Sequence, residues 1–415
     1  MPRARRKERP ARQRLQIVIL LGEMVLLIGI AGFGAAQTAP ASSGTSTGTV
    51  TSVPSAGGSW RFVVSGDSRN CGDVVMPAIA ARSGQFAPKF YWHLGDLRAI
   101  YKIDEDMAYA AQNRGEALSC ENYQRRAWDD FVENQIAPFG DVPFYVGIGN
   151  HEVIAPKNED AFKRHFFDWL NLPALQRQRE LDGEPLAPEP YYHWIQGGVD
   201  FIYLDNASGF FSDDELTWLV RRLQSAKSNP VVKSVIVGMH QALPDSIANG
   251  HSMGENQDEP RARPSGENAY TALLAFHKLT NKPVYLLASH SHFYMENIFD
   301  TDKLKENGAE PLPGWIVGTG GAVRYKLPAG DWPKAKTDVY GYLLGTVSAE
   351  GKTQFSYEEV RKSDVPESVL QRYPAKLVPW CFEHNSQNKD PDAPDITSVT
   401  PRCTPPAPGA GGHSH

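Results

Sequence analysis

The stretch Gly147–Glu152 reads Gly-Ile-Gly-Asn-His-Glu and follows an apolar run, Val-Pro-Phe-Tyr-Val, at 142–146. The apolar run predicts a buried strand, and the two glycines let the chain turn sharply where that strand ends. An amide, an imidazole and a carboxylate then stand side by side. The amide oxygen is a neutral metal ligand, and the imidazole can bind metal or transfer protons. By itself such a stretch also fits an ordinary polar turn.

The same pattern of apolar strand, small residue and polar side chain recurs along the chain. The predicted strands and the residues that follow them are Arg61–Ser65 with Asp67, Phe90–Leu94 with Asp96, Val231–Gly238 with His240, and Val284–Ala288 with His290 and His292. Helices predicted between the strands indicate an α/β fold with a mainly parallel sheet. The carboxyl ends of parallel strands share one side of a sheet, so these polar residues are predicted to meet there.

Six residues of metal-ligand type converge in this prediction. They are Asp67, Asp96, Asn150, His240, His290 and His292. A mixed set of nitrogen and oxygen ligands suits Mn, Fe or Zn better than Ca or Mg. Six are too many for one catalytic ion with an open position, so the set predicts two divalent or trivalent transition-metal ions bridged by a carboxylate. His93, inside an apolar run, is instead predicted to be a core residue.

The ordered set Gly-Asp, Gly-Asp, Gly-Asn-His-Glu, His and His-x-His resembles the calcineurin-like metallophosphoesterase family over residues 62–321. The Gly-Thr-Gly-Gly turn at 318–321 is similar to the closing turn of that family. The resemblance implies a four-layer αββα sandwich of two mixed β-sheets flanked by helices. It also implies an enzyme that hydrolyses phosphomonoesters or small phosphodiesters by in-line attack of metal-bound hydroxide.

The resemblance also assigns roles. Asp96 would bridge both ions, Asp67 and His292 would hold the first ion, and Asn150, His240 and His290 would hold the second. His151 would lie beside the ions, where it could contact the substrate phosphate or protonate the leaving oxygen. Ala99 stands where some protein phosphatases of the family carry an Asp that orients this histidine, which argues against that branch.

Position 69 departs from the family, whose first motif usually reads Gly-Asp-x-His. Arg69 cannot bind metal while charged. Either the first ion keeps fewer ligands and binds more weakly, or a residue such as Tyr101 completes its shell, or Arg69 grips the substrate phosphate. We favour the third outcome combined with the first, which makes Arg69 and His151 the predicted catalytic residues; a surface ion pair is the alternative for Arg69. Arg98 is predicted to pair with an acid in 104–106.

Substrate contacts are predicted for Arg69, His151 and His251. His251, with Asp245, lies in a long loop at 241–267 that is rich in Gly, Pro and charged residues, and a solvent-exposed loop is the alternative. Residues 172–190 are predicted to be irregular because they contain several prolines.

The N-terminal segment predicts export. Seven basic side chains lie in residues 1–14, and an apolar stretch with Glu23 in its middle follows. Residues 1–36 are therefore predicted to be a cleaved signal peptide or an uncleaved membrane anchor, the only expected membrane contact. We expect a flexible linker at 37–58, the metallophosphoesterase domain at 59–385 and a Pro/Gly-rich extended tail at 386–415. The mature protein would lie in the periplasm, outside the cell, or on the outer face of the cytoplasmic membrane.

Charge and cysteines agree with export of an enzyme for small substrates. Residues 37–415 carry 35 basic and 46 acidic side chains, a formal net charge of -11, which disfavours long nucleic acids as partners. Four cysteines without Cys-x-x-Cys spacing predict two disulfides, with sequence order favouring Cys71–Cys120 and Cys381–Cys403. The alternatives to a small-substrate phosphoesterase are a non-catalytic or single-metal phospholigand-binding protein and a nucleotide or cyclic-nucleotide phosphodiesterase.

Overall fold

The computed structural model describes residues 58–255, 258–308, 310–388 and 402–403. Contacts divide the chain into Met1–Gly58 and Ser59–His415, and the second unit carries the fold described below. The predicted export segment and all but the last residue of the predicted linker lie outside the described residues. The predicted tail is described only at its first three residues and at 402–403.

The first sheet has five strands in the order β12-β11-β1-β2-β3. Its strands are β1 (Trp60–Ser65), β2 (Tyr91–His93), β3 (Phe144–Val146), β11 (Tyr340–Val347) and β12 (Thr353–Val360). Strands β1, β2 and β3 run parallel, whereas β11 and β12 are antiparallel additions at one edge. Ser65 pairs with His93 and His93 with Val146, so the three parallel strands end level with one another. The residues that follow them therefore emerge together.

The second sheet has seven strands in the order β10-β8-β9-β7-β6-β5-β4. Its strands are β4 (Tyr192–Gln196), β5 (Val199–Leu204), β6 (Ser234–Met239), β7 (Val284–Ala288), β8 (Tyr294–Glu296), β9 (Gly314–Val317) and β10 (Ala335–Lys336). Strands β5, β6, β7 and β9 are parallel, and antiparallel strands close both edges. Both sheets are thus mixed, with a parallel centre.

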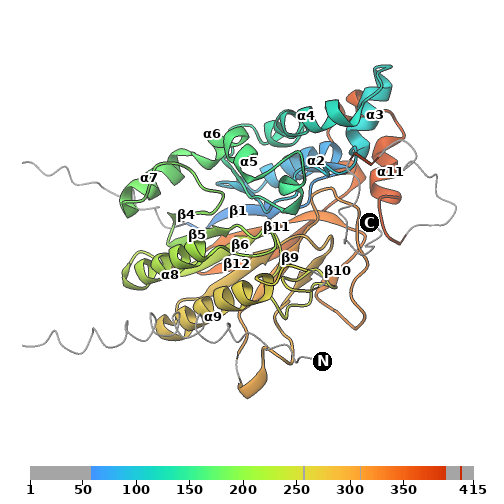
Figure 1. The fold of residues 1–415 in the computed structure, drawn as a ribbon. Coiled ribbons are helices and arrows are strands. Elements are labelled where there is room, and N and C mark those ends of the chain that lie inside the picture. Colours follow the sequence, from blue (N-terminus) through green and yellow to red (C-terminus); the bar gives the residue numbers. More distant parts are fainter. Residues whose placement is uncertain (1–57, 256–257, 309, 389–401, 404–415) are drawn as a thin grey trace, which may run out of the picture. The chain divides into compact units, whose positions relative to one another are not determined.

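The two sheets pack face to face through aromatic side chains. The ring of Phe62 on β1 lies 5.1 Å from that of Phe201 on β5, and the ring of Trp92 on β2 lies 5.3 Å from that of Trp194 on β4. Helices α8 (Asp213–Ser228) and α9 (Ala262–Thr280) cover the second sheet, and α2 (Gly72–Gly84) and α6 (Phe167–Leu170) cover the first (Figure 1). The expected four-layer α/β sandwich is confirmed, with two mixed sheets in place of one mainly parallel sheet.

The prediction of an irregular segment at 172–190 is wrong in its first half. Helix α7 spans Pro173–Asp182, with Pro173 in its first turn and Gly183 ending it at a left-handed φ of 65°. Proline is tolerated in the first turn, where the missing N–H has no partner to lose, so it begins this helix instead of preventing it. The predicted loop at 241–267 is also shorter, because α9 already begins at Ala262.

Five further α-helices complete the described chain. They are α3 (Glu105–Asn113), α4 (Cys120–Phe131), α5 (Glu159–His165), α10 (Glu367–Arg372) and α11 (Leu377–Glu383). A π-helical turn, Val132–Ile136, continues α4, and a 3₁₀ turn, Asn150–Val153, follows β3. Within the described part of the chain, no helix has the length and apolarity needed to cross a membrane.

The disulfide pairing favoured by sequence order is wrong. Cys71 pairs with Cys381, and Cys120 pairs with Cys403, with Cα atoms 5.9 Å and 5.1 Å apart. The chain returns late to its own early part, since α11 lies against the start of α2 and residue 403 reaches the start of α4. Sequence order cannot reveal such long-range closure. Both bonds hold C-terminal segments against the half of the domain that carries Asp67 and Asp96.

Candidate metal centre

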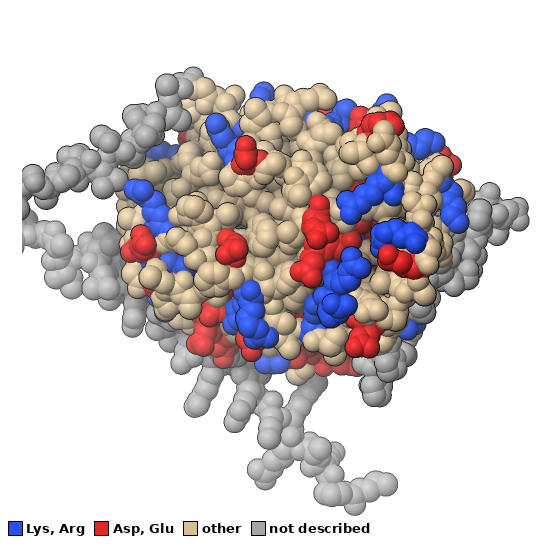
Figure 2. Space-filling view, turned by 90° about the horizontal axis from the view of Figure 1, so that it is seen from above, with Lys and Arg blue, Asp and Glu red and all other residues tan. Residues whose placement is uncertain are grey.

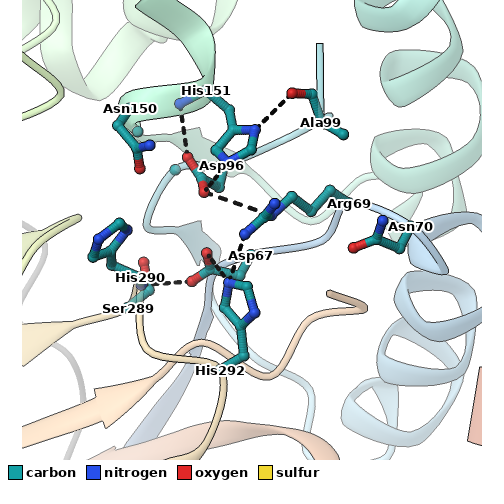
Figure 3. A network of polar contacts seen from close by, with 12 residues as sticks. Asp67, Arg69, Asn70, Asp96, Ala99, Asn150, His151, Ser289, His290 and His292 are labelled. Carbon is teal, nitrogen blue, oxygen red and sulfur yellow. Dashed lines mark hydrogen bonds and ion pairs between the residues drawn. The ribbon is translucent and has the colours of Figure 1, made fainter. Parts of the chain in front are cut away.

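The structure brings the six predicted ligand residues together at the carboxyl ends of five parallel strands. Asp67 follows β1, Asp96 follows β2, Asn150 follows β3, His240 follows β6, and His290 and His292 follow β7. Figure 3 shows side chains from these separate turns pointing toward one another. Two overlapping groups have ligand atoms within 4.8 Å of each other: Asp96 with His240 and His290, and Asp67 with Asp96 and His292. Asp96 belongs to both groups.

The turns that carry these ligands are strained and closely packed. Asp67, Asp96 and His290 adopt left-handed backbone angles, with φ of 57°, 59° and 65°. Such conformations cost on the order of 1–3 kcal/mol each and cluster at functional sites. Gly149 has no room for a side chain, because a Cβ there would lie 2.4 Å from Asp96 Oδ1 and 2.5 Å from the Asp96 backbone nitrogen. The turn after β3 therefore needs glycine to approach the turn after β2.

His240 is the centre of the first ligand group. Its Nδ1 lies 3.0 Å from the Leu94 carbonyl, an acceptor, so Nδ1 carries the proton and Nε2 carries a lone pair. Nε2 lies 2.9 Å from Asn150 Oδ1, 3.2 Å from Asp96 Oδ1 and 3.1 Å from His290 Nδ1. Lone pairs thus converge from several sides. We call Asp96, Asn150, His240 and His290 the His240 group.

Asp67 and His292 form the second group, and a cation from the chain reaches it. His292 Nδ1 lies 2.7 Å from the Val323 carbonyl and so donates to it, which leaves a lone pair on Nε2. Asp67 Oδ1 lies 3.1 Å from this Nε2, and Arg69 Nη2 lies 3.1 Å from it as well. Arg69 is buried, at 3% exposure, and its guanidinium enters between Asp96 and His292 (Figure 3). We call Asp67, Asp96 and His292 the His292 group.

Asp96 is fixed by its neighbours so that it can serve both groups. Its Oδ1 accepts the backbone N–H of His151 at 3.0 Å, while the buried Oδ2 has no hydrogen-bond partner among the described residues. Glu152, whose role the sequence left open, accepts the backbone N–H groups of Asp96, Leu97 and Gly149 at 2.8–3.0 Å. Burial, with the charge of Asp96, raises the pKa of Glu152 well above its usual range. Glu152 thus ties the turn after β2 to the turn after β3.

His151 lies beside the His292 group and is oriented by the main chain. Its Nδ1 donates to the Ala99 carbonyl at 2.6 Å, and its Nε2 lies 3.5 Å from Asp96 Oδ2. The backbone carbonyl of Ala99 therefore orients the imidazole of His151, at the position where some protein phosphatases of the resembling family carry an orienting Asp side chain. Burial, with the nearby charge of Arg69, lowers the pKa of His151 to about 3. The imidazole is neutral in the free protein and carries a lone pair on Nε2.

The predicted contact residue His251 reaches the site. Its ring lies 5.2 Å from that of His290 and is stacked on Tyr325, also at 5.2 Å, with the imidazole half-buried. Tyr325 was not predicted, and its ring lies 4.0 Å from that of His292. No motif marks Tyr325 in the sequence; only its place four residues after the Gly-rich turn could have drawn attention to it. Tyr101, considered above as a ligand, has its ring 5.3 Å from that of His151.

Three other polar residues have structural surroundings. Arg98 is fully buried and pairs with acids, including Asp106 at 2.9 Å, as predicted. His93 is a buried core residue, as predicted, with Nε2 3.0 Å from the Ser68 hydroxyl. Asp245 forms ion pairs with Arg263 and Lys303.

The chemistry of the His240 group fits a transition metal. Burial and neighbouring His240 lower the pKa of His290 well below its usual range, and burial with Arg69 lowers that of His292. Neutral imidazole is the form that binds metal. The converging lone pairs, and the buried Oδ2 of Asp96 that has no hydrogen-bond donor among the described residues, would also be stabilised by a cation.

Comparison with known proteins yields distant structural likenesses. No protein-family model matches the sequence, and no curated protein matches it. The chain is similar to the purple acid phosphatase PPD1 from yellow lupin (Lupinus luteus) seeds, with 17% identity, a TM-score of 0.49, and 74% of this chain and 52% of that chain covered. It is also similar to PhoD (13% identity, TM-score 0.45, 74% and 70% covered) and to a phosphatase from Mycoplasma pneumoniae (12%, 0.33, 77% and 99%). The chain spans about half the length of the lupin protein. The TM-scores of these three structures are below 0.5, so the likenesses carry no conclusion about function.

Proposed function

We propose that the protein is a metal-dependent hydrolase of phosphoric esters that acts on phosphomonoesters or small phosphodiesters. One observation carries the proposal. Asn150 Oδ1 and Asp96 Oδ1 both lie within 3.2 Å of His240 Nε2, so the lone pairs of three atoms converge. The buried guanidinium of Arg69 lies near the other carboxylate oxygen of Asp96. A cation and a fixed positive group on either side of one carboxylate can stabilise the several charged oxygens of a phosphoryl group.

The His240 group would hold the metal. Its two imidazoles, one amide and one carboxylate suit Mn, Fe or Zn. Such an ion lowers the pKa of bound water and offsets negative charge on a phosphate. Glu152 contributes by fixing the two turns from which Asp96 and Asn150 emerge. The occupant of the His292 group is treated in the next subsection.

Arg69 would bind the substrate phosphate. A guanidinium has five N–H donors in a fork that matches two phosphate oxygens, and burial strengthens each contact. The guanidinium of Arg69 is held by His292, whose Nε2 lies 3.1 Å from Arg69 Nη2, and by Asp96, whose Oδ2 lies 3.7 Å from Arg69 Nε. The buried position argues for a group that is fixed before the substrate arrives. It also disfavours the surface ion pair that the sequence left as an alternative.

His151 would transfer a proton to the leaving oxygen. The hydrogen bond from Nδ1 to the Ala99 carbonyl directs Nε2 toward Asp96 and the His292 group. Nε2 has no proton to give in the neutral form. A bound phosphate dianion would favour the imidazolium, since a nearby negative charge favours the charged form of a base. His151 would then donate from Nε2 as the ester bond breaks.

The surface of the protein supports a small substrate, and its disulfides support export of the protein itself. Figure 2 shows acidic and basic side chains interspersed on the face it draws, without a continuous basic patch of the kind that long nucleic acids require. His251 and Tyr325, stacked at one side of the site, would contact the group esterified to the phosphate. Two disulfides are typical of proteins outside the cytoplasm, which supports export to the periplasm, the exterior or the outer membrane face.

The test is a phosphoester panel combined with metal analysis on the same purified sample. We expect bound Mn, Fe or Zn and cleavage of p-nitrophenyl phosphate or its bis ester. Asp96→Asn should remove metal and activity together. Asp200→Asn is the matched control, because Asp200 is equally buried but bonds His193, at 2.8 Å, away from both ligand groups. Tight phospholigand binding without turnover would favour the non-catalytic alternative, and selective cleavage of cyclic nucleotides would favour the phosphodiesterase.

A further inference from the structure

We propose that Arg69 is a built-in cation of the His292 group. The protein then holds one exchangeable metal ion, in the His240 group, although the six ligand-type residues alone predict two ions. The inference rests on the proposed function and specifies its cofactor. It assigns the second positive charge of the site to the polypeptide. The two ligand groups differ in that a positively charged donor of the chain contacts an imidazole nitrogen in the His292 group but not in the His240 group.

The His292 group already has a positively charged donor. His292 Nε2 and Asp67 Oδ1 both present lone pairs and lie 3.1 Å apart, an arrangement that is repulsive unless a cation is shared. Arg69 Nη2, 3.1 Å from Nε2, supplies that charge and a hydrogen bond. The second oxygen of Asp67 accepts the backbone N–H of His290 at 2.7 Å. The lone pairs of His292 Nε2 and the two oxygens of Asp67 thus already face donors of the chain, one of them positively charged.

The His240 group has lone pairs in excess. His240 Nδ1 is committed to the Leu94 carbonyl, and the Ser289 hydroxyl, 3.0 Å from the same carbonyl, donates there too. Of the partners of Nε2, the oxygens of Asn150 and Asp96 cannot donate, and His290 Nδ1, 3.1 Å away, is a neutral nitrogen that brings no positive charge. This is the group in which an added cation removes repulsion without displacing a side chain.

Asp96 separates the two cations and faces both. Oδ1 points to His240 Nε2 at 3.2 Å, whereas Oδ2 lies 3.7 Å from Arg69 Nε. Neither Oδ2 nor Nε has a hydrogen-bond partner among the described residues, so each is the nearest opposite charge available to the other. The carboxylate that would bridge two ions instead lies between one metal position and the guanidinium.

Arg69 cannot give way by losing its charge. A guanidinium keeps its proton in proteins, and the carboxylate of Asp96, 3.7 Å from Nε, favours the charged form. A second divalent ion in the His292 group would therefore need to push out a charged, buried side chain. A neutral side chain at position 69 would remove both the obstruction and the repulsion.

The test counts Mn²⁺ ions in the full chain. Wild type, Arg69→His, Arg69→Met and Arg69→Lys are stripped with chelator, reconstituted with Mn²⁺ and desalted, and manganese per chain is measured by mass spectrometry. We expect one ion in the wild type and in Arg69→Lys, with the electron paramagnetic resonance signal of an isolated Mn²⁺. Arg69→His should double the count and give an exchange-coupled spectrum. Arg69→Met, which keeps no polar group that could disturb folding, should bind a second ion more weakly.

The outcomes separate the inference from the proposed function. Two exchange-coupled ions in the wild type would overturn the inference and leave the phosphoesterase intact. A single ion in every variant would also overturn it, because the charge of Arg69 would then not limit the count. If no variant retains a metal ion when Mn²⁺, Fe²⁺ and Zn²⁺ are each offered in turn, the proposed function and the inference are overturned together.

Discussion

The chain uses the same four-residue pattern twice, with opposite results. Gly66-Asp67-Ser68-Arg69 follows β1, and Gly95-Asp96-Leu97-Arg98 follows the neighbouring strand β2. Both aspartates adopt the left-handed backbone conformation, and both arginines are buried. Yet Arg69 points at the ligand groups, whereas Arg98 points away from them into a cluster of acids.

The difference lies in what other elements place opposite each arginine. Four carboxylates surround Arg98: Asp73, Asp104, Asp106 and Asp130. Arg69 meets one imidazole lone pair and the edge of Asp96. A guanidinium surrounded by carboxylates has no donor to spare for a ligand. One with few partners is available to bind an anion.

The acid cluster of Arg98 also supports the Arg69 region. Asp104 accepts the backbone N–H of Asn70 at 2.7 Å and that of Ala99 at 3.1 Å. Asn70 directly follows Arg69, and the carbonyl of Ala99 orients His151. The comparison therefore separates a structural arginine, which holds the two turns, from a functional one, which those turns present.

Replacing each arginine by Met should have the largest effects and tests directly whether Arg98 is structural and Arg69 functional. Arg98→Met leaves several buried carboxylates without a counter-charge, and we expect the free energy of unfolding to fall by about 3–5 kcal/mol. Arg69→Met should cost less stability with Mn²⁺ present, while lowering kcat/KM about 100-fold through loss of phosphate binding. Urea denaturation and steady-state kinetics on both variants check this. Equal losses of stability would contradict the division of roles.

Strand-end patterns predict that these six residues lie close together, because the position of a parallel strand's carboxyl end depends on local sequence and on the sheet; their role as metal ligands stays a prediction. Contacts between side chains and distant segments leave no such local pattern in the sequence. Glu152 could be seen as polar, but its three backbone partners come from two turns. The Ala99 carbonyl has no sequence signature at all, since every residue has one.

The two arginines show the same limit. Their motifs are alike, so sequence could suggest a pairing with acids at 104–106 for Arg98, which are close in the chain. It could not place Arg69 beside His292, 223 residues away. The disulfide pairing could not be predicted for a similar reason, because Cys71 and Cys381 are 310 residues apart and only the fold brings them together.

The excess of acid around Arg98 predicts that the stability of the protein depends on pH. Burial and Asp73 outweigh Arg98 and raise the pKa of Asp130 to about 7. The folded state thus keeps this proton longer than the unfolded state, whose Asp pKa is about 3.9. The stability that the protonated group contributes is present below pH 4 and is lost as pH rises to 7.

Asp130→Asn removes the contribution of Asp130 to the pH dependence of stability, because the amide does not titrate. The variant should gain stability relative to wild type between pH 4 and pH 7, by up to about 4 kcal/mol, and the difference should stay constant above pH 7. Urea midpoints at several pH values measure it. A difference that does not change with pH would show that Asp130 is ionised throughout and that Arg98 balances more carboxylates than we infer.

His151→Asn should change stability least of these variants, and it tests whether the Ala99 carbonyl of the Arg98 region positions a catalytic group. The Asn amide can keep the hydrogen bond that Nδ1 makes to the Ala99 carbonyl, but it has nothing in place of Nε2. If Nε2 protonates the leaving oxygen, activity should fall about 100-fold on an alkyl phosphate and only about 10-fold on p-nitrophenyl phosphate, whose leaving group needs little protonation. His151→Ala, which also loses the bond to Ala99, should in addition lower stability. Equal losses of rate on both substrates would mean that His151 only contacts the phosphate, and that the Ala99 carbonyl positions a binding group.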